Sequence, residues 1–205
     1  MLVKEVRKIT DRKVKVFLED GASFVLYGAE AGKLGIHPGE DLPGETISRI
    51  REEILKKRSR LRCLNLLKAS DRTQQQLRER LIRDGYPEDI ISQALEYVAS
   101  FHYTDDRRYA ENYIRQMSGR KSTRQIEFEL MKKGVDRETV RAALSAREED
   151  EEDAEKEAVL ALARKRGYNA ETASREETAR FFRYLAGKGF GYDLIQRVFS
   201  SGDQS

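Results

Sequence analysis

An internal repeat constrains the fold of this chain more than any other feature of the sequence. The segment 103–144 matches an earlier one when shifted back by 49 residues, from 126 to 77, and a later one when shifted forward by 55, from 126 to 181. Neither match needs a gap, and the coinciding positions are apolar or glycine. They are Leu77, Ile126 and Phe181; Leu81, Leu130 and Leu185; Gly85, Gly134 and Gly189; Ile91, Val140 and Ile195; and Leu95, Leu144 and Phe199. The sequence therefore predicts three tandem three-helix repeats.

Helix start and stop signals recur together with the apolar positions. A hydroxyl residue followed three positions later by Gln or Glu forms a capping box, which starts a helix. Each repeat glycine stands where a helix should end in a left-handed residue. The boxes are Thr73-x-x-Gln76, Ser122-x-x-Gln125 and Ser174-x-x-Glu177, the last displaced by three residues relative to the others.

The N-terminal segment has a different period. A strand is expected over 13–18, where Val14, Val16 and Leu18 alternate with Lys13, Lys15 and Phe17. A two-residue hairpin turn at Asp20-Gly21 leads into a second, antiparallel strand over residues 23–27. Residues 2–9 are expected to add a third strand. A helical turn over 29–34 should stop at Gly35, and His37 to Glu40 should form a turn. We expect a small antiparallel β module that needs a helix to cover one face.

A long helix is expected to connect this module to the repeats. It begins near Pro43 and carries Ile47, Ile50, Ile54, Leu61, Leu64 and Leu67 at helical spacing. Its basic cluster, Lys56-Lys57-Arg58-Ser59-Arg60-Leu61-Arg62, is either a solvated face or a ridge that contacts phosphates. The predicted fold is mainly α, with the three repeats in an elongated array. Its expected segments are 1–42, 43–101, 102–147 and 148–205.

Composition limits the remaining possibilities. Hydrophobic residues make up 39% and charged residues 37%, a ratio that suits thin helical layers. The net charge of +3 divides into +3 over 1–104, +4 over 105–147 and −4 over 148–205. The single cysteine, Cys63, excludes an internal disulfide and is expected to be a small core residue. Without an apolar run of about 18 residues or a signal peptide, the default is a cytoplasmic protein.

Few residues suggest catalysis. His37 is expected in a turn and His102 in a packed junction, while Asp105 and Asp106 are best explained as partners of the helix that follows them. The acidic run 148–157 is interpreted as a linker helix, because contiguous carboxylates diverge around a helix axis and do not converge on a metal ion. A metal-dependent hydrolase, the third class considered, would depend on this run alone. We therefore expect no enzyme activity, no cofactor and no metal.

A basic surface is the main candidate for function. Three-helix units of this size are similar to helix-turn-helix modules, which place a helix against DNA. The candidate contacts are Arg115, Arg120, Lys121, Arg124, Lys132 and Lys133 in the second repeat, and Arg72, Arg78, Arg80 and Arg83 in the first.

The second repeat resembles the central motif of the bacterial RecX regulatory proteins. The motif is Tyr103-Thr104-Asp105-Asp106-x-Arg108-Tyr109-Ala110, then Ile114-Arg115, then Ile126-x-x-Glu129-Leu130-x-x-Lys133-Gly134-Val135. Arg72-Thr73-x-x-x-Leu77-x-x-x-Leu81-x-x-x-Gly85 is similar to the family's opening repeat, and the resemblance covers about 59–199. One departure is Ser122-Thr123, which stands where the family often has Gly-Pro; it affects a local loop.

The resemblance implies a regulator that binds the RecA recombinase–DNA filament and limits its extension, ATPase activity and strand exchange. It adds Arg108 to the candidate contacts. The expected partners are the RecA filament and single- or double-stranded DNA, with the chain acting as a monomer. The alternative from the residues alone is a helical DNA-binding module that acts without a recombinase.

Overall fold

The computed structural model describes residues 1–146 and 148–200, the side chains of 148–151 excepted. The chain divides into two compact units, one from Met1 to Asp105 and one that begins at Asp106. The four-segment division expected from the sequence is finer than this and stays a prediction.

The first unit opens with the expected antiparallel sheet, whose strands are β1 (Val3–Lys8), β2 (Lys13–Leu18) and β3 (Ser23–Tyr27), in that order. Val16 and Leu18 are buried on one face, as the alternation predicted. The two-residue hairpin turn was wrong. The amide of Leu18 donates to the carbonyl of Ala22, so the loop holds Glu19, Asp20 and Gly21. Gly21 has φ +87°, the left-handed conformation that the last residue of a three-residue hairpin loop adopts when it forms a β-bulge.

A long helix follows the short helix α1 (Gly28–Lys33) and the turn at His37. It consists of α2 (Gly44–Arg49), the π-helical turn η1 (Ile50–Leu55) and α3 (Lys56–Ala69). In η1 the amide of Lys56 donates to the carbonyl of Arg51, five residues back. The extra residue moves the buried row onto Leu55, Ser59 and Cys63, and leaves Leu61 58% exposed. The prediction that Leu61 belongs to the apolar face was therefore wrong, and the buried position of Cys63 is confirmed.

The first repeat consists of α3, α4 (Gln74–Arg83) and α5 (Glu88–Ser100). Its core contains Cys63, Leu77, Leu81, Ile91, Ala94, Leu95 and Val98. The capping box at Thr73 is confirmed, with Gln76 N donating to Thr73 Oγ1 at 3.2 Å and Thr73 N donating to Gln76 Oε1 at 3.2 Å. His102 follows α5 with φ 55° and is exposed, so the packed junction expected there was wrong.

The sheet and the first repeat share one helix. Ile90 of α5 is fully buried in the sheet core, while the adjacent Ile91 is buried in the repeat core. Tyr86 packs against both cores, and burial raises the pKa of its hydroxyl to about 12. Gly85, with φ +85°, lies so close to β3 that an added Cβ would be 2.3 Å from Val25 Cγ2. The β module therefore packs directly on the repeat.

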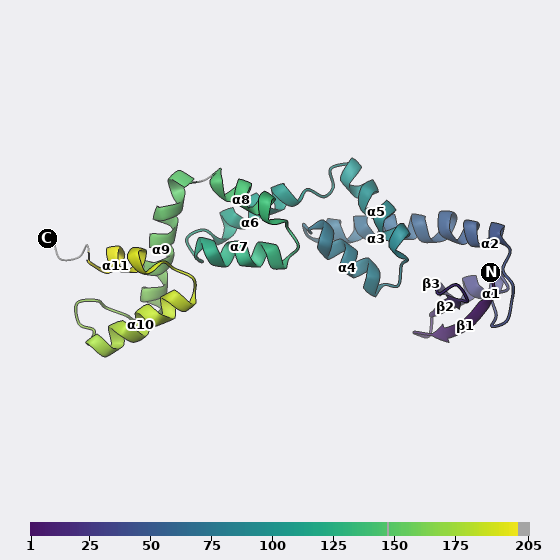
Figure 1. Ribbon diagram of the computed structural model, residues 1–205, viewed down its shortest axis with the longest axis horizontal. Helices are drawn as coiled ribbons and strands as arrows, with labels where there is room; N and C mark the ends of the chain where they lie inside the picture. The colour runs from purple at the N-terminus through teal and green to yellow at the C-terminus, as the bar shows by residue number, and fades with distance from the viewer. Residues whose placement is uncertain (147, 201–205) are drawn as a thin grey trace. The chain divides into compact units, whose positions relative to one another are not determined.

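The second unit contains the other two repeats (Figure 1). The second consists of α6 (Asp106–Met117), α7 (Thr123–Lys132) and α8 (Arg137–Ser145), and the third of α9 (Glu148–Arg166), α10 (Arg175–Gly187) and α11 (Tyr192–Ser200). The repeat positions Ile126, Leu130 and Val140, like Phe181, Leu185 and Ile195, are buried in separate cores, whereas Leu144 and Phe199 pack at the margins. Gly134 and Gly189 have φ 88° and 90°. The three-repeat prediction is confirmed.

The start of α7 joins the second and third repeats. Ser122 Oγ accepts from the amide of Gln125 at 3.2 Å and donates to the carbonyl of Lys188 at 2.7 Å. The amide of Thr123 donates to Glu155 Oε1 of α9 at 2.6 Å. The reciprocal bond of the expected capping box, from the Ser122 amide to Gln125 Oε1, is not formed in the described structure, and Gln125 Nε2 donates to Glu129 Oε1 at 3.3 Å. Ser122 and Thr123, the departure from the family motif, thus hold two repeats together.

Candidate nucleic-acid and partner interface

Ion pairs within the first unit hold several of the cations predicted to contact a partner. Arg78 pairs with Glu88, and Arg80 Nε lies 3.5 Å from Asp84 Oδ1 without hydrogen-bond geometry. Arg72 is half-buried, and its Nε is buried without a hydrogen bond in the described structure. Arg83 is exposed, and its Nε donates to the carbonyl of Glu79. Since a paired guanidinium attracts a phosphate less, this unit is the weaker candidate.

The basic cluster of α3 is also engaged inside the first unit. Arg58 pairs with Glu30 and lies 4.6 Å from the Tyr27 ring centroid. Arg62 Nε donates to Asp84 Oδ2 at 2.7 Å, and the Arg60 guanidinium lies 4.5 Å from the Tyr97 ring centroid. These contacts fasten the helix to the sheet and to its own repeat. They favour a structural role for the three arginines over a phosphate-contacting ridge.

Lys121 in the second repeat belongs to a hydrogen-bonded network. Its Nζ pairs with Glu129 Oε2 at 2.6 Å, and the Tyr113 hydroxyl donates to the same carboxylate. Burial by itself would raise the pKa of Glu129, but hydrogen bonds from Lys121 and Tyr113 lower it below the usual value. The same bond to Glu129 raises the pKa of Lys121. Lys133 is half-buried, 5.3 Å from the Tyr113 ring centroid. This network braces α7 against α6.

The remaining candidate cations are exposed on the second repeat. Arg108 and Arg115 lie on α6, Arg120 in the loop before α7, and Arg124 and Lys132 on α7. Among the described side chains, those of 1–146 and 152–200, no acidic group forms an ion pair with Arg115, Arg120, Arg124 or Lys132. Their charge is therefore available to an anionic partner, as expected for an interface that reads phosphates.

An exposed aromatic ring lies among these cations, and sequence reasoning missed it. Phe128 is 62% exposed on α7, on the side of the helix away from the buried Ile126 and Leu130. Arg124 precedes it by four residues and Lys132 follows it by four, so the three side chains form one stripe. An apolar residue outside the core positions was the available signal.

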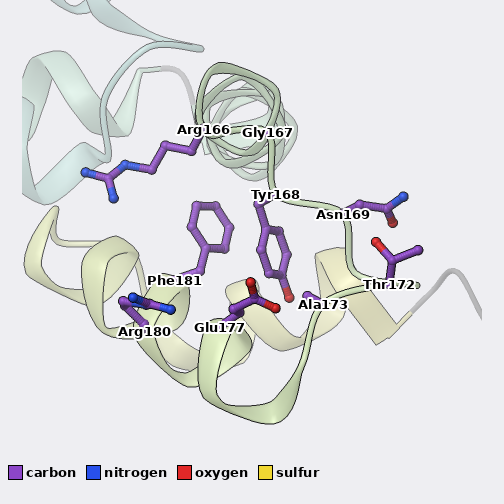
Figure 2. Close-up of a pocket in the computed structure, with 9 residues that line it drawn as sticks. All are labelled: Arg166, Gly167, Tyr168, Asn169, Thr172, Ala173, Glu177, Arg180 and Phe181. Carbon is purple, nitrogen blue, oxygen red and sulfur yellow. The ribbon is translucent and has the colours of Figure 1, made fainter.

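Of the cavities that border the third repeat, two bear on the candidate site. The first, of about 300 Å³, is lined by the residues drawn in Figure 2, where the Tyr168 and Phe181 rings face one another with centroids 4.1 Å apart. Its carboxylate, Glu177, caps α10 by accepting from the amide of Ser174 at 2.9 Å, and that hydrogen bond lowers the pKa of Glu177. The carboxylate of Glu177 is thus engaged in capping the helix, which is a structural role.

The second cavity, a groove of about 500 Å³, lies beside the Phe128 stripe. Arg124, Gln125 and Phe128 form one wall, and residues 186–189 at the end of α10 form the other. The groove is open and has cationic side chains on both walls, since Lys188 is exposed. It extends the stripe towards the third repeat.

The described residues contain no group of three or more His, Cys, Asp or Glu placed to hold a metal ion. The side chains of 148–151, which open the acidic run, lie outside the described structure. α6 begins at Asp106, so this carboxylate lies in the first turn, as expected. No helix in the part of the chain described is both long enough and apolar enough to cross a membrane.

The fold and the surface together define a class of protein: a tandem array of three-helix domains with an exposed cationic face. Family models for the first, second and third three-helix domains of RecX match residues 60–97, 105–144 and 153–199. The chain belongs to the RecX family.

Curated relatives and solved structures agree with this assignment. The chain is 27% identical over 198 residues to "Regulatory protein RecX" of Clostridium botulinum strain Eklund 17B, covering 95% of this chain and 92% of the relative. It is 30% identical over 144 residues to the protein of the same name from Chromobacterium violaceum, covering 69% of this chain and 88% of the relative. A crystal structure of regulatory protein RecX is similar with a TM-score of 0.63 at 19% identity, covering 97% and 98%. The crystal structure of RecX from Lactobacillus salivarius is similar with a TM-score of 0.61 at 24% identity, covering 74% of this chain and 98% of that one.

Proposed function

We propose that this chain binds the filament that the RecA recombinase forms on DNA and limits its extension, its ATPase activity and strand exchange. The observation that carries the proposal is the match of all three repeats to RecX domains, in the family's order. The chain then acts as a monomeric, cytoplasmic, non-enzymatic regulator that needs no cofactor. The exposed candidate cations Arg115, Arg120, Arg124 and Lys132 support it, because a filament on DNA is an anionic partner.

The three repeats differ in a way that bears on this role. The first repeat uses Arg78 and Arg80 in ion pairs, whereas the second leaves Arg115, Arg120, Arg124 and Lys132 exposed. Contacts made by exposed cations weaken with added salt. We therefore assign the main anionic contact to the second repeat.

DNA-dependent ATP hydrolysis by RecA tests the proposal. Substoichiometric amounts of the chain should slow hydrolysis, because a bound regulator that stops extension acts on many protomers. The double variant Arg120→Glu, Arg124→Glu should lose most of this effect at about 0.15 M salt, where unpaired surface charges still act over about 8 Å. Arg141→Glu, a charge reversal at an exposed position of α8, is the control. Unchanged hydrolysis at equimolar chain would refute the proposal.

A stand-alone DNA-binding module is the second candidate, favoured by the same exposed cations. It predicts binding to DNA in the absence of a recombinase. If all four cations contact phosphates, log affinity should fall against log salt concentration with a slope of about −2.8 for single strands and about −3.6 for duplex. Proteins that contact phosphates normally lose much of their affinity for DNA as salt rises over roughly 0.05–0.2 M. An affinity that stays constant over this range would count against this candidate.

A further inference from the structure

The α7 stripe is unusual because it exposes an aromatic side chain without using it in the core. Fully burying a phenylalanine side chain is favourable by about 1.5–3 kcal/mol, and Phe128 forgoes most of that. The coinciding positions of the other repeats, 49 residues earlier and 55 later, carry Glu79 and Arg183. The repeat fold therefore does not need an aromatic residue here, and the ring is specific to the second repeat.

The charges around the ring indicate the chemistry of its partner. Arg124 and Lys132 lie four residues on either side of Phe128, about 6 Å along the helix axis in each direction. Arg120 precedes the helix, and Lys188 approaches from the far wall of the groove beside Arg124. A ring between cations is the pattern with which proteins bind single-stranded nucleic acid, because bases stack on the ring while phosphates contact the cations.

We propose that Phe128 is a stacking platform for an unpaired DNA base, and that the α7 stripe binds single-stranded DNA in preference to duplex. In a duplex the faces of the bases are covered by their neighbours, so the ring can stack only on an unpaired base. The groove between α7 and the end of α10 gives the stacked base and its sugar room beside the ring. Phosphates on either side then lie within reach of Arg124 and Lys132. This inference deepens the proposed function, since it names the part of the filament that the second repeat touches.

A tryptophan placed at the stripe gives a direct readout. The chain contains no tryptophan, so Phe128→Trp carries a single indole whose fluorescence reports its own contacts. A thymidine oligonucleotide of about 16 nucleotides, long enough for one binding site, should quench this fluorescence, and a blunt-ended duplex without unpaired bases should not. Phe101→Trp is the control. Phe101 is 57% exposed, but its neighbours at four residues are Tyr97 and Asp105, and quenching there should be absent.

Affinity and salt dependence separate stacking from charge. Phe128→Ala should weaken binding to the oligonucleotide by about 5- to 150-fold without changing the salt slope, and Phe128→Tyr should restore most of it. Lys132→Ala should instead reduce the slope by about 0.7. All of these measurements omit the recombinase, so their failure leaves the filament proposal standing. The stacking proposal would be overturned if the oligonucleotide left the indole unquenched and Phe128→Ala bound it as tightly as the parent chain. If Phe128→Ala then weakened only the inhibition of RecA, the ring would contact protein.

Discussion

Replacing Gly85 by alanine tests the contact that joins the sheet to the first repeat. An alanine Cβ would lie 2.3 Å from Cγ2 and 3.3 Å from Cβ of Val25, and Val25 is itself buried. The left-handed backbone, φ +85°, costs an L-residue about 1–2 kcal/mol. Crowding against a packed side chain adds about 1–3 kcal/mol. We expect Gly85→Ala to destabilise the first unit by about 2–5 kcal/mol in total.

Gly39 provides a matched control within the same unit. It has φ +84°, but an added Cβ would meet nothing within 4 Å. Gly39→Ala should therefore carry only the backbone term. The difference between the two variants isolates the crowding term, and for a unit of this size each kcal/mol lowers Tm by roughly 4–8 °C.

Chemical denaturation followed by far-ultraviolet circular dichroism measures both variants. The midpoint should fall further for Gly85→Ala than for Gly39→Ala, with unchanged m. Adding Val25→Ala to Gly85→Ala removes the clashing methyl groups, so the double variant should be less destabilised than the two single effects added together. Equal destabilisation by the two glycine replacements would show that β3 does not crowd Gly85, and the reasoning would be refuted.

Three further expectations follow from single contacts. Glu129→Gln should destabilise the second unit by about 1–2 kcal/mol, because the ion pair with Lys121 is replaced by a hydrogen bond to an uncharged amide. Because the pKa of Glu129 is lowered in the folded state, the carboxylate stabilises the protein above its unfolded-state pKa, and this stability is lost as pH falls through the folded-state pKa. The free energy of unfolding of the variant should therefore fall less steeply with acid. An unchanged acid dependence would contradict the network. Burial raises the pKa of Cys63 to about 11, so a thiol reagent near neutral pH should label it only as the first unit unfolds, and rapid labelling of the native chain would contradict its burial. Ser122→Ala loses both a helix cap and the bond to Lys188 and should cost about 2 kcal/mol in denaturation, against about 1 for Ser174→Ala, which loses only a cap; equal costs would mean that the bond to Lys188 adds nothing.

The parts of the fold that could be predicted depend on local patterns. Leu77, Leu81 and Gly85 recur in register because a helix face and its stop are determined by neighbours in sequence. Cys63 was correctly expected in the core, but the exposure of Leu61 and the burial of Leu55 could not be predicted, since η1 adds one residue to a turn and shifts the phase of everything after it.

The candidate surface was predictable in composition but not in detail. Counting basic residues found both the paired and the exposed cations, because the acidic partner of Arg78 lies on the next helix and that of Arg58 lies near the sheet. Lys121 looked like a contact and is a brace, held by Glu129. Phe128 was missed because the search was for charge. The signal was present in the sequence, because Phe128 stands two positions from both Ile126 and Leu130, which the repeat had identified as core positions.

Ile90 and Ile91 have a consequence for how members of this family can vary. These consecutive residues of one helix insert into two different cores, the sheet on one side and the first repeat on the other. A family member without the sheet would leave the residue at position 90 facing water, while the residue at position 91 would remain enclosed. Gain or loss of the sheet should therefore be accompanied by an exchange between apolar and polar residues at position 90, and position 91 should stay apolar in both kinds of chain. One helical position would then record whether a homologous chain possesses the N-terminal sheet.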